Sequence, residues 1–178
     1  VSGGALGVEN ALKAAFDWKV RKSGRESATQ ILHFKDAFHG RTGYTLSLTN
    51  TADPRKTALF PKFSWPRVSN PKLRFPAEGE NLRATIRDEE QSLREIEQVF
   101  ARLKGEIAAI ILEPIQCEGG DHHFRTEFLR KVREIADREE AMLIFDEVQV
   151  GFFSTGKPWC WQNQGVVPDL VAFGKKAQ

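Results

Sequence analysis

The chain has 178 residues, of which 40% are hydrophobic, and 26 basic side chains nearly balance 24 acidic ones for a formal net charge of +2. This composition is typical of a globular domain with a core, and it argues against a disordered tail, a collagen-like repeat or a nucleic-acid-binding protein. No stretch approaches the roughly 20 apolar residues that a membrane-spanning helix needs. Cys117 and Cys160 form no CxxC pair, so we expect reduced thiols in a cytoplasmic protein.

The first part of the chain predicts a helix, a strand and a long irregular segment. Apolar residues between Val8 and Phe16 recur every three or four positions, and a basic run over residues 19–25 closes this helix. The run QILHF (30–34) has the length of a strand. Residues 53–76 contain five prolines and little periodicity, which indicates a long irregular segment. Segments of this length in a compact domain are usually functional or cover a neighbouring element.

The rest of the chain alternates helices with short apolar strands. We expect helices over 82–104 and 126–139, the first ending near Gly105, and strands over 107–112, 142–145 and 170–173. The run IAAIIL (107–112) is apolar throughout, as expected for a strand that is covered on both faces. Strands that alternate with helices predict a largely parallel α/β sheet.

Three of these strands end in groups that can carry chemistry. Glu113 follows the strand 107–112, Asp146 follows 142–145, and Lys175 follows 170–173. Ligands of open α/β sheets bind beyond the carboxyl ends of the strands, so the two carboxylates and the amine should reach the same edge. The alternative interpretation is that each charge only ends its strand in solvent.

Small residues precede the first predicted helix. Gly3, Gly4 and Ala5 would let backbone N–H groups approach an anion, and a helix N-terminus favours a phosphate there. A lysine, an aspartate and a phosphate cradle are together the requirements of pyridoxal phosphate. The lysine amine can form a Schiff base, and the aspartate can keep the pyridinium nitrogen protonated.

Longer motifs carry a family resemblance over essentially the whole chain. The runs DEVQVGFFSTGK (146–157) and GVVPDLVAFGKK (165–176) resemble the signature of class III pyridoxal-phosphate aminotransferases. Three further family blocks occur in the expected order: GGALGVENALKAA (3–15), AFHGRTGYT (37–45) and EPIQCEGGD (113–121). Within this class, the segment 48–67 is most similar to the L-lysine 6-aminotransferase subgroup. The resemblance implies the fold-type I large domain, a three-layer α/β/α arrangement on a mostly parallel sheet.

The resemblance also implies how the cofactor is held. Lys175 corresponds to the Schiff-base lysine, with Lys176 as the alternative, and Asp146 to the partner of the pyridinium nitrogen. Gln149 corresponds to the residue near the phenolic oxygen of the cofactor. The remaining cofactor contacts are two residues that flank the ring and two that bind the phosphate through their backbone: Phe38, Val148, Gly4 and Ala5.

On the substrate side, Arg41 corresponds to the arginine that accepts the α-carboxylate, a task that suits a guanidinium. Glu118 resembles a glutamate that pairs with and gates a second arginine, for which no position here can be assigned. Two departures from the family pattern stand out. Ser154 replaces an arginine, which the lysine subgroup also lacks, and Cys117 replaces a glycine next to Glu118 and could crowd that loop.

Other polar residues are expected to play lesser roles. His122 and His123 are adjacent and lack metal-ligand spacing, so no metal site is predicted. His39 lies near the expected cofactor but is not assigned proton transfer, since Lys175 suits that role. Glu113 is expected to support the site rather than take part in the chemistry.

The implied reaction is transfer of the ε-amino group of L-lysine to 2-oxoglutarate, giving 2-aminoadipate 6-semialdehyde and L-glutamate. An amino-acid donor and a 2-oxo-acid acceptor are then the partners, and the parent protein is expected to be a homodimer. The motif order and the lack of an initiator methionine suggest that residues 1–178 are a central part of the large domain, without the N-terminal segment and the C-terminal small domain. Two alternatives remain open: an ω-aminotransferase for ornithine or a related diamine, and a non-catalytic fragment or pseudoenzyme.

Overall fold

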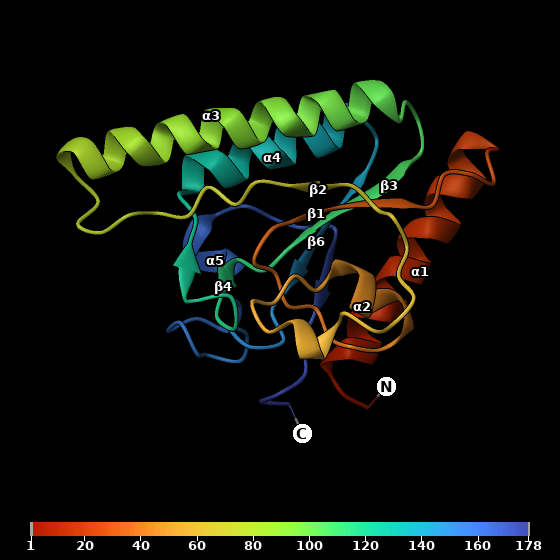
Figure 1. Ribbon diagram of the computed structural model, residues 1–178, viewed down its shortest axis with the longest axis horizontal. Helices are drawn as coiled ribbons and strands as arrows, with labels where there is room; N and C mark the ends of the chain where they lie inside the picture. Colours follow the sequence, from red (N-terminus) through yellow and green to blue (C-terminus); the bar gives the residue numbers. More distant parts are fainter. Residues whose placement is uncertain (1, 178) are drawn as a thin grey trace.

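The computed structural model describes residues 2–177 and is organised around a five-stranded sheet (Figure 1). Every strand pairing in this sheet is parallel. The strands, in their spatial order, are β2 (Arg67–Val68), β1 (Gln30–Phe34), β3 (Ile107–Leu112), β6 (Met142–Asp146) and β7 (Leu170–Ala172). The predicted parallel α/β sheet is therefore confirmed, and four of its strands coincide with the predicted apolar runs to within one residue.

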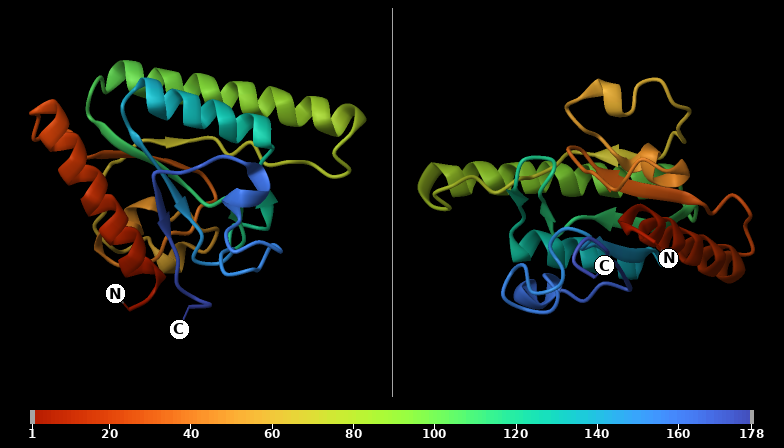
Figure 2. Two further views of the ribbon diagram at one scale, coloured as in Figure 1. Left: turned by 180° about the vertical axis from the view of Figure 1, so that it is seen from behind. Right: turned by 90° about the horizontal axis from the view of Figure 1, so that it is seen from below.

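Helices cover both faces of the sheet, as Figure 2 shows from behind and from below. On one face lie α1 (Gly4–Ser23) and the short α2 (Gly43–Leu48). On the other face α3 (Gly79–Arg102) and α4 (Thr126–Arg138) run side by side. This is the three-layer α/β/α arrangement that the family resemblance implies. The remaining elements are η1 (Pro54–Lys56), α5 (Trp161–Gln164) and a hairpin of β4 (Ile115–Gln116) and β5 (His122–His123).

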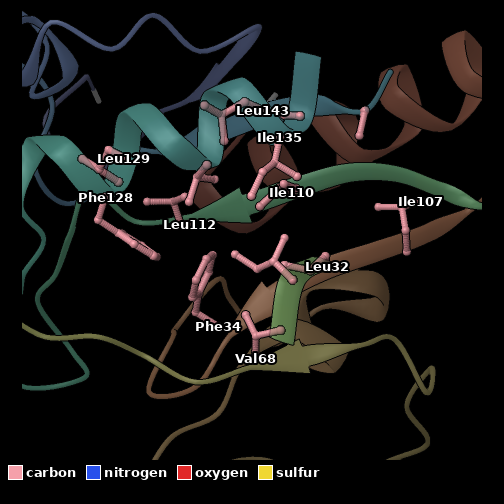
Figure 3. Close-up of a cluster of buried hydrophobic side chains, with 14 of the residues drawn as sticks. Leu32, Phe34, Val68, Ile107, Ile110, Leu112, Phe128, Leu129, Ile135 and Leu143 are labelled. Atoms are coloured by element: carbon pink, nitrogen blue, oxygen red, sulfur yellow. The ribbon is translucent and has the colours of Figure 1, made fainter. Parts of the chain in front are cut away.

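The strand β3 is buried at all six positions because it lies between the two helical layers. Ile110 and Leu112 belong to the core on the α3–α4 side, whereas Ile111 belongs to the core on the α1 side. Figure 3 shows the larger core, in which Leu32 and Phe34 of β1 lie near Ile110 and Leu112. A continuous apolar run is thus explained by burial on both faces rather than by membrane insertion.

A buried lysine joins the two helical layers at the amino-terminal edge of the sheet. Lys19 of α1 is only 4% exposed, and its Nζ donates hydrogen bonds to the carbonyl oxygens of Glu139 (3.2 Å) and Glu140 (2.7 Å) just after α4. These carbonyls lie at a helix C-terminus, where a cation is favourable. Burial lowers the pKa of Lys19, although the Glu140 charge opposes this effect.

The structure differs from the predictions mainly in short elements. The excursion 53–76 is largely irregular, but it contains η1 and the two-residue edge strand β2. Its pairing with β1 is extended by hydrogen bonds from His33 N–H to the Pro66 carbonyl and from Lys35 N–H to the Val68 carbonyl. The helix α2 and the β4–β5 hairpin were not predicted, because two to six residues carry too little periodicity. In residues 2–177 no helix is both long and apolar enough to cross a membrane.

One buried side chain in this fold makes stability depend on pH. His33 of β1 is 1% exposed, and neither of its ring nitrogens has a well-formed hydrogen bond within residues 2–177. Burial, with the nearby charges of Arg67 and His39, lowers the pKa of His33 well below 6.5. The ring is therefore neutral in the folded protein under conditions in which the unfolded chain takes up a proton.

We expect the free energy of unfolding to fall as the pH drops below about 6.5, by up to about 1.4 kcal/mol per pH unit from His33. The sign follows because the unfolded state binds the proton and the folded state does not. His33→Leu should remove this part of the dependence, which urea unfolding at several pH values measures. A difference between wild type and variant that stays constant from neutral to acidic pH would contradict the prediction.

Candidate active site

The carboxyl ends of β1, β3, β6 and β7 meet the N-terminus of α1 around a cavity of about 180 Å³. After β1 the chain adds β2 on one side, whereas β3, β6 and β7 follow in order on the other, so the strand order reverses between β1 and β3. Ligands of such sheets bind beyond the carboxyl ends of the strands at this kind of switch point. The cavity is lined by Gly4, Ala5, Phe38, His39, Gly40, Glu113, Glu118, Asp146, Val148, Gln149 and Lys175. All predicted cofactor-binding residues are in this set, and the groups that follow three separate strands do reach one edge.

A buried hydrogen bond links the end of β6 to the segment after β1. Asp146 Oδ2 lies 2.8 Å from Nδ1 of His39, and Asp146 Oδ1 accepts the Val148 N–H at 3.0 Å. Because an ionised carboxylate can only accept, Nδ1 of His39 carries the proton. Nε2 of His39 is buried without a partner among the described residues. The contact of His39 with Asp146 was not predicted, since the two residues are 107 positions apart.

Glu113 supports the same wall of the cavity from the end of β3. Its Oε1 accepts the backbone N–H of Phe38 at 2.8 Å, and the residue is only 5% exposed. Burial raises the pKa of Glu113 to about 8; the Asp146 charge adds to this effect, and His39 opposes it. The carboxyl group is thus largely protonated near neutral pH, which agrees with a supporting role.

The pKa of His39 is raised by the two carboxyl groups next to its ring. Burial lowers the pKa of the ring, but the hydrogen bond and charge of Asp146, together with Glu113, outweigh burial and raise it above 6.5. The donated Nδ1–H of His39 satisfies the Asp146 carboxyl group in a buried place, where a polar group without a partner is costly. The negative charge of Asp146 is therefore held in one orientation at the cavity wall.

The N-terminus of α1, which also borders the cavity, can accept an anion. The helix α1 begins after Gly3, which provides no side-chain cap, and its first turn has no acidic residue. A Cβ on Gly4 would collide with the side chain of Val148, so only glycine lets the helix start approach this closely. The free N–H groups of the first turn and the helix dipole favour a negative group here.

The two candidate lysines differ in their positions. Lys175 lines the cavity, and its Nζ donates a hydrogen bond to Oε1 of Gln149. Lys176 is not among the lining residues, and its Nζ donates to the backbone carbonyl of Gln149 instead. This arrangement favours Lys175 as the amine that acts in the cavity.

The predicted substrate residues lie farther out. Glu118 is at the cavity mouth, where Oε1 lies 2.5 Å from Nζ of Lys56. Arg41 is exposed and lies outside the central cavity, beside Lys56 in a neighbouring cavity of about 300 Å³. The structure thus brings Glu118 to the site but separates Arg41 from the cofactor contacts.

The loop that carries Glu118 packs closely against Asp36 at Gly119. The Cys117 thiol donates a weak hydrogen bond to the Ile115 carbonyl, with Sγ 3.7 Å from that oxygen. A Cβ on Gly119 would overlap the Asp36 carbonyl oxygen, so only glycine fits at this position of the loop. The other departure from the family pattern, Ser154, donates a hydrogen bond to the Gly151 carbonyl at 2.7 Å and closes a turn.

The adjacent histidines of the hairpin have structural contacts. Nδ1 of His122 lies 3.1 Å from both Asn70 Nδ2 and Gln116 Oε1, and the ring of His123 contacts that of Phe75 edge-on. Within the part of the chain that the structure describes, no group of three or more potential ligands is arranged to hold a metal ion.

Comparison with known proteins identifies the family. Residues 1–178 match the family model described as aminotransferase class-III. The chain belongs to the class III aminotransferases. It is 54% identical to the L-lysine-epsilon aminotransferase of Mycobacterium tuberculosis, and the alignment covers 100% of this chain and 40% of that protein. The chain therefore spans about two fifths of the length of this relative.

Solved structures of aminotransferases are similar over the same region. A lysine aminotransferase from M. tuberculosis, in the internal aldimine form, matches with a TM-score of 0.93 and 52% identity, covering 100% of this chain and 41% of that one. An amine transaminase from an uncultivated Pseudomonas species, bound to pyridoxal phosphate, matches with a TM-score of 0.82 and 29% identity, covering 98% and 39%. The fold of this aminotransferase domain is thereby established.

The raised pKa of Glu113 yields a test of the buried cluster. Glu113→Gln keeps an acceptor for the Phe38 N–H but removes the ionisable group. Because the pKa of about 8 lies above the ordinary value of 4.5, the folded protein keeps a proton that the unfolded chain loses, and stability falls as pH rises between these values. As the pH rises from 4.5 to about 8, wild type should lose stability that E113Q keeps. The free energy of unfolding of E113Q minus that of wild type, measured by urea unfolding, should therefore increase with pH. If this difference in free energy of unfolding does not change with pH, Glu113 is not held protonated in the folded protein.

Proposed function

We propose that the protein is a pyridoxal-phosphate-dependent aminotransferase that transfers the ε-amino group of L-lysine to 2-oxoglutarate, giving 2-aminoadipate 6-semialdehyde and L-glutamate. The observation that carries this proposal is the single cavity that brings Lys175, Asp146 and the N-terminus of α1 together. The 54% identity to an L-lysine-epsilon aminotransferase supports lysine as the amino donor.

Features of the cavity fit pyridoxal phosphate. An uncapped helix N-terminus and a glycine that admits no Cβ suit a phosphate, and a buried carboxylate suits a protonated ring nitrogen. When bound, the cofactor supplies an electron sink that allows an amino group to be taken up and passed on. Phe38 and Val148 would hold its ring between them, and Gln149 would approach its phenolic oxygen.

The residues of the chain then have distinct tasks. Asp146 would hold the ring nitrogen of the bound cofactor, and His39 fixes the orientation of that carboxyl group through Nδ1. The free Nζ of Lys175 moves a proton from and to the substrate carbon, since an amine held within reach is an effective general base. Arg41 binds the α-carboxylate of lysine, so that the distal amine points toward the ring.

We also propose that the protein works as a homodimer in the cytoplasm. Leu59, Phe60 and Phe63 are 91%, 53% and 52% exposed, and such a group of apolar side chains favours contact with another subunit. Cys117 and Cys160 are both free, which is in keeping with a reducing compartment.

Amino-donor preference tests the proposed function. With 2-oxoglutarate as acceptor, we expect kcat/KM for L-lysine to exceed that for L-ornithine, because Arg41 anchors the longer chain with its amine at the reacting position. Asp146→Asn serves as a control that should fold with a similar melting temperature and lose activity by orders of magnitude. A preference for ornithine would contradict the lysine assignment, and full activity of D146N would contradict the role of Asp146.

A further inference from the structure

The segment that carries Lys175 leaves the sheet before it reaches the cavity. A hydrogen bond of 2.8 Å from the Glu147 N–H to the Ala172 carbonyl holds the end of β7. The strand ends at Ala172, and its pairing with β6 ends there too, so strand pairing does not fix residues 173–175. The direction of the Lys175 side chain therefore depends on packing beyond the sheet.

A glycine brings this segment against the start of α1. A Cβ on Gly174 would lie 2.9 Å from the backbone nitrogen of Gly4 and 3.0 Å from its Cα, so a side chain here would force the two segments apart. The close approach places Lys175 next to the helix N-terminus that suits a phosphate. A glycine has no side chain that could hold the segment in this place, so the support must come from a neighbouring residue.

An aromatic cluster of Phe152, Trp159 and Phe173 provides this support. The ring centre of Trp159 lies 5.2 Å from that of Phe173 and 5.4 Å from that of Phe152, and the two phenylalanine centres are 5.7 Å apart. Separations of about 4.5–7 Å are typical of favourable aromatic pairs. Because Phe173 is two residues before Lys175, the three rings hold the start of the segment that carries the lysine.

Trp159 has a fixed position relative to β6. The Glu147 carboxylate follows this strand, is 1% exposed, and accepts the backbone N–H groups of Cys160 (2.7 Å) and Trp161 (2.8 Å), which come directly after Trp159. A Cβ on Gly151 would lie 3.1 Å from the Trp159 ring and 2.9 Å from the Glu147 carbonyl oxygen, so the backbone packs closely around the indole. The aromatic cluster is thereby joined to the strand that ends in the cofactor contacts.

The turn that supplies Phe152 is strained. Phe152 and Phe153 have φ angles of 54° and 62°, in the left-handed region that is unfavourable for bulky side chains. Strain of this kind persists where the surrounding structure compensates for it, and it is concentrated near functional sites. Here the strained turn carries a ring that packs against both Trp159 and Phe173.

We propose that Trp159 is a positioning residue that, through Phe173, holds the Lys175 amine at the aldehyde of bound pyridoxal phosphate. This inference rests on the proposed function for the identity of the cofactor. The amine and the aldehyde condense with loss of one water molecule. When the amine is displaced from the aldehyde, the equilibrium shifts toward hydrolysis by water, which frees the cofactor.

Release of two forms of the cofactor tests the inference. Pyridoxamine phosphate has an amine in place of the aldehyde, so it occupies the cavity without a covalent bond to Lys175. In protein loaded with either form, we expect Trp159→Leu to accelerate release of pyridoxal phosphate about tenfold, the size that two aromatic contacts support, and to change release of pyridoxamine phosphate little. Trp159→Phe keeps a ring and should retain wild-type rates. Cofactor fluorescence after dilution measures both rates.

The matched control is Trp18→Leu, which should release both forms at wild-type rates. Trp18 is a half-buried tryptophan of α1 that contacts Lys22 and lines a different cavity. Phe173→Leu removes the other ring of the contact and should act like W159L, which keeps the test available if W159L does not fold. In a Lys175→Ala background W159L should no longer alter release of pyridoxal phosphate, because the covalent bond is already lost.

Four results would each overturn the inference: no retention of pyridoxal phosphate by the wild-type protein, equal acceleration of both cofactor forms by W159L and F173L, equal rates of release from W159L and W18L, or an effect of W159L that persists in K175A. Cofactor release needs no turnover. A protein that retains pyridoxal phosphate in this way but does not transaminate lysine would therefore refute the proposed reaction alone.

Discussion

The hydrogen bond between His39 and Asp146 is the interaction on which the rest of the site depends. It joins the end of β6 to the segment after β1 and holds a buried carboxylate in one orientation. Burying a carboxylate is costly unless hydrogen-bond donors satisfy it, and Nδ1 of His39 and the backbone N–H of Val148 do so for Asp146. The parallel sheet makes this contact possible, because it brings both strand ends to the same edge.

The polar groups around the cavity differ in their charge. Glu113, with a pKa of about 8, contributes little negative charge near neutral pH, and Nδ1 of His39 donates a hydrogen bond to Asp146. The uncapped N-terminus of α1 presents free N–H groups beside the same cavity. The cavity therefore combines a buried carboxylate held by His39 with an uncapped helix N-terminus, and these two features suit the protonated ring nitrogen and the phosphate of pyridoxal phosphate.

The sequence predicted the elements that are long or uniformly apolar. The run 107–112 has burial on both faces, and the amphipathic stripe of α4 spans more than three turns, so each pattern is stronger than its alternatives. The two-residue strands and α2 were missed because their positions are fixed by contacts with β1 and α1, not by local periodicity. The residues predicted to contact the cofactor came from motifs, and the structure places them around one cavity.

Contacts between distant segments could not be predicted from patterns. His39 and Asp146 are 107 residues apart, and Lys56 and Glu118 are 62 apart, so neither pair leaves a signal in local spacing. Arg41 illustrates the reverse case: the motif that contains it also contains Phe38, yet the backbone turn through Gly40, with its positive φ of 118°, directs Arg41 to a neighbouring cavity. Sequence motifs therefore identified the candidate residues, and the fold determines which of them line the central cavity.

The most direct test of the central claim is to identify the lysine that carries the cofactor. Treating the pyridoxal-phosphate-loaded protein with borohydride and mapping its peptides by mass spectrometry locates a covalently fixed pyridoxyl group. The geometry of the cavity predicts the modification on Lys175, and its loss in Lys175→Ala. Modification of Lys176, or of no lysine in the segment after β7, would contradict the account.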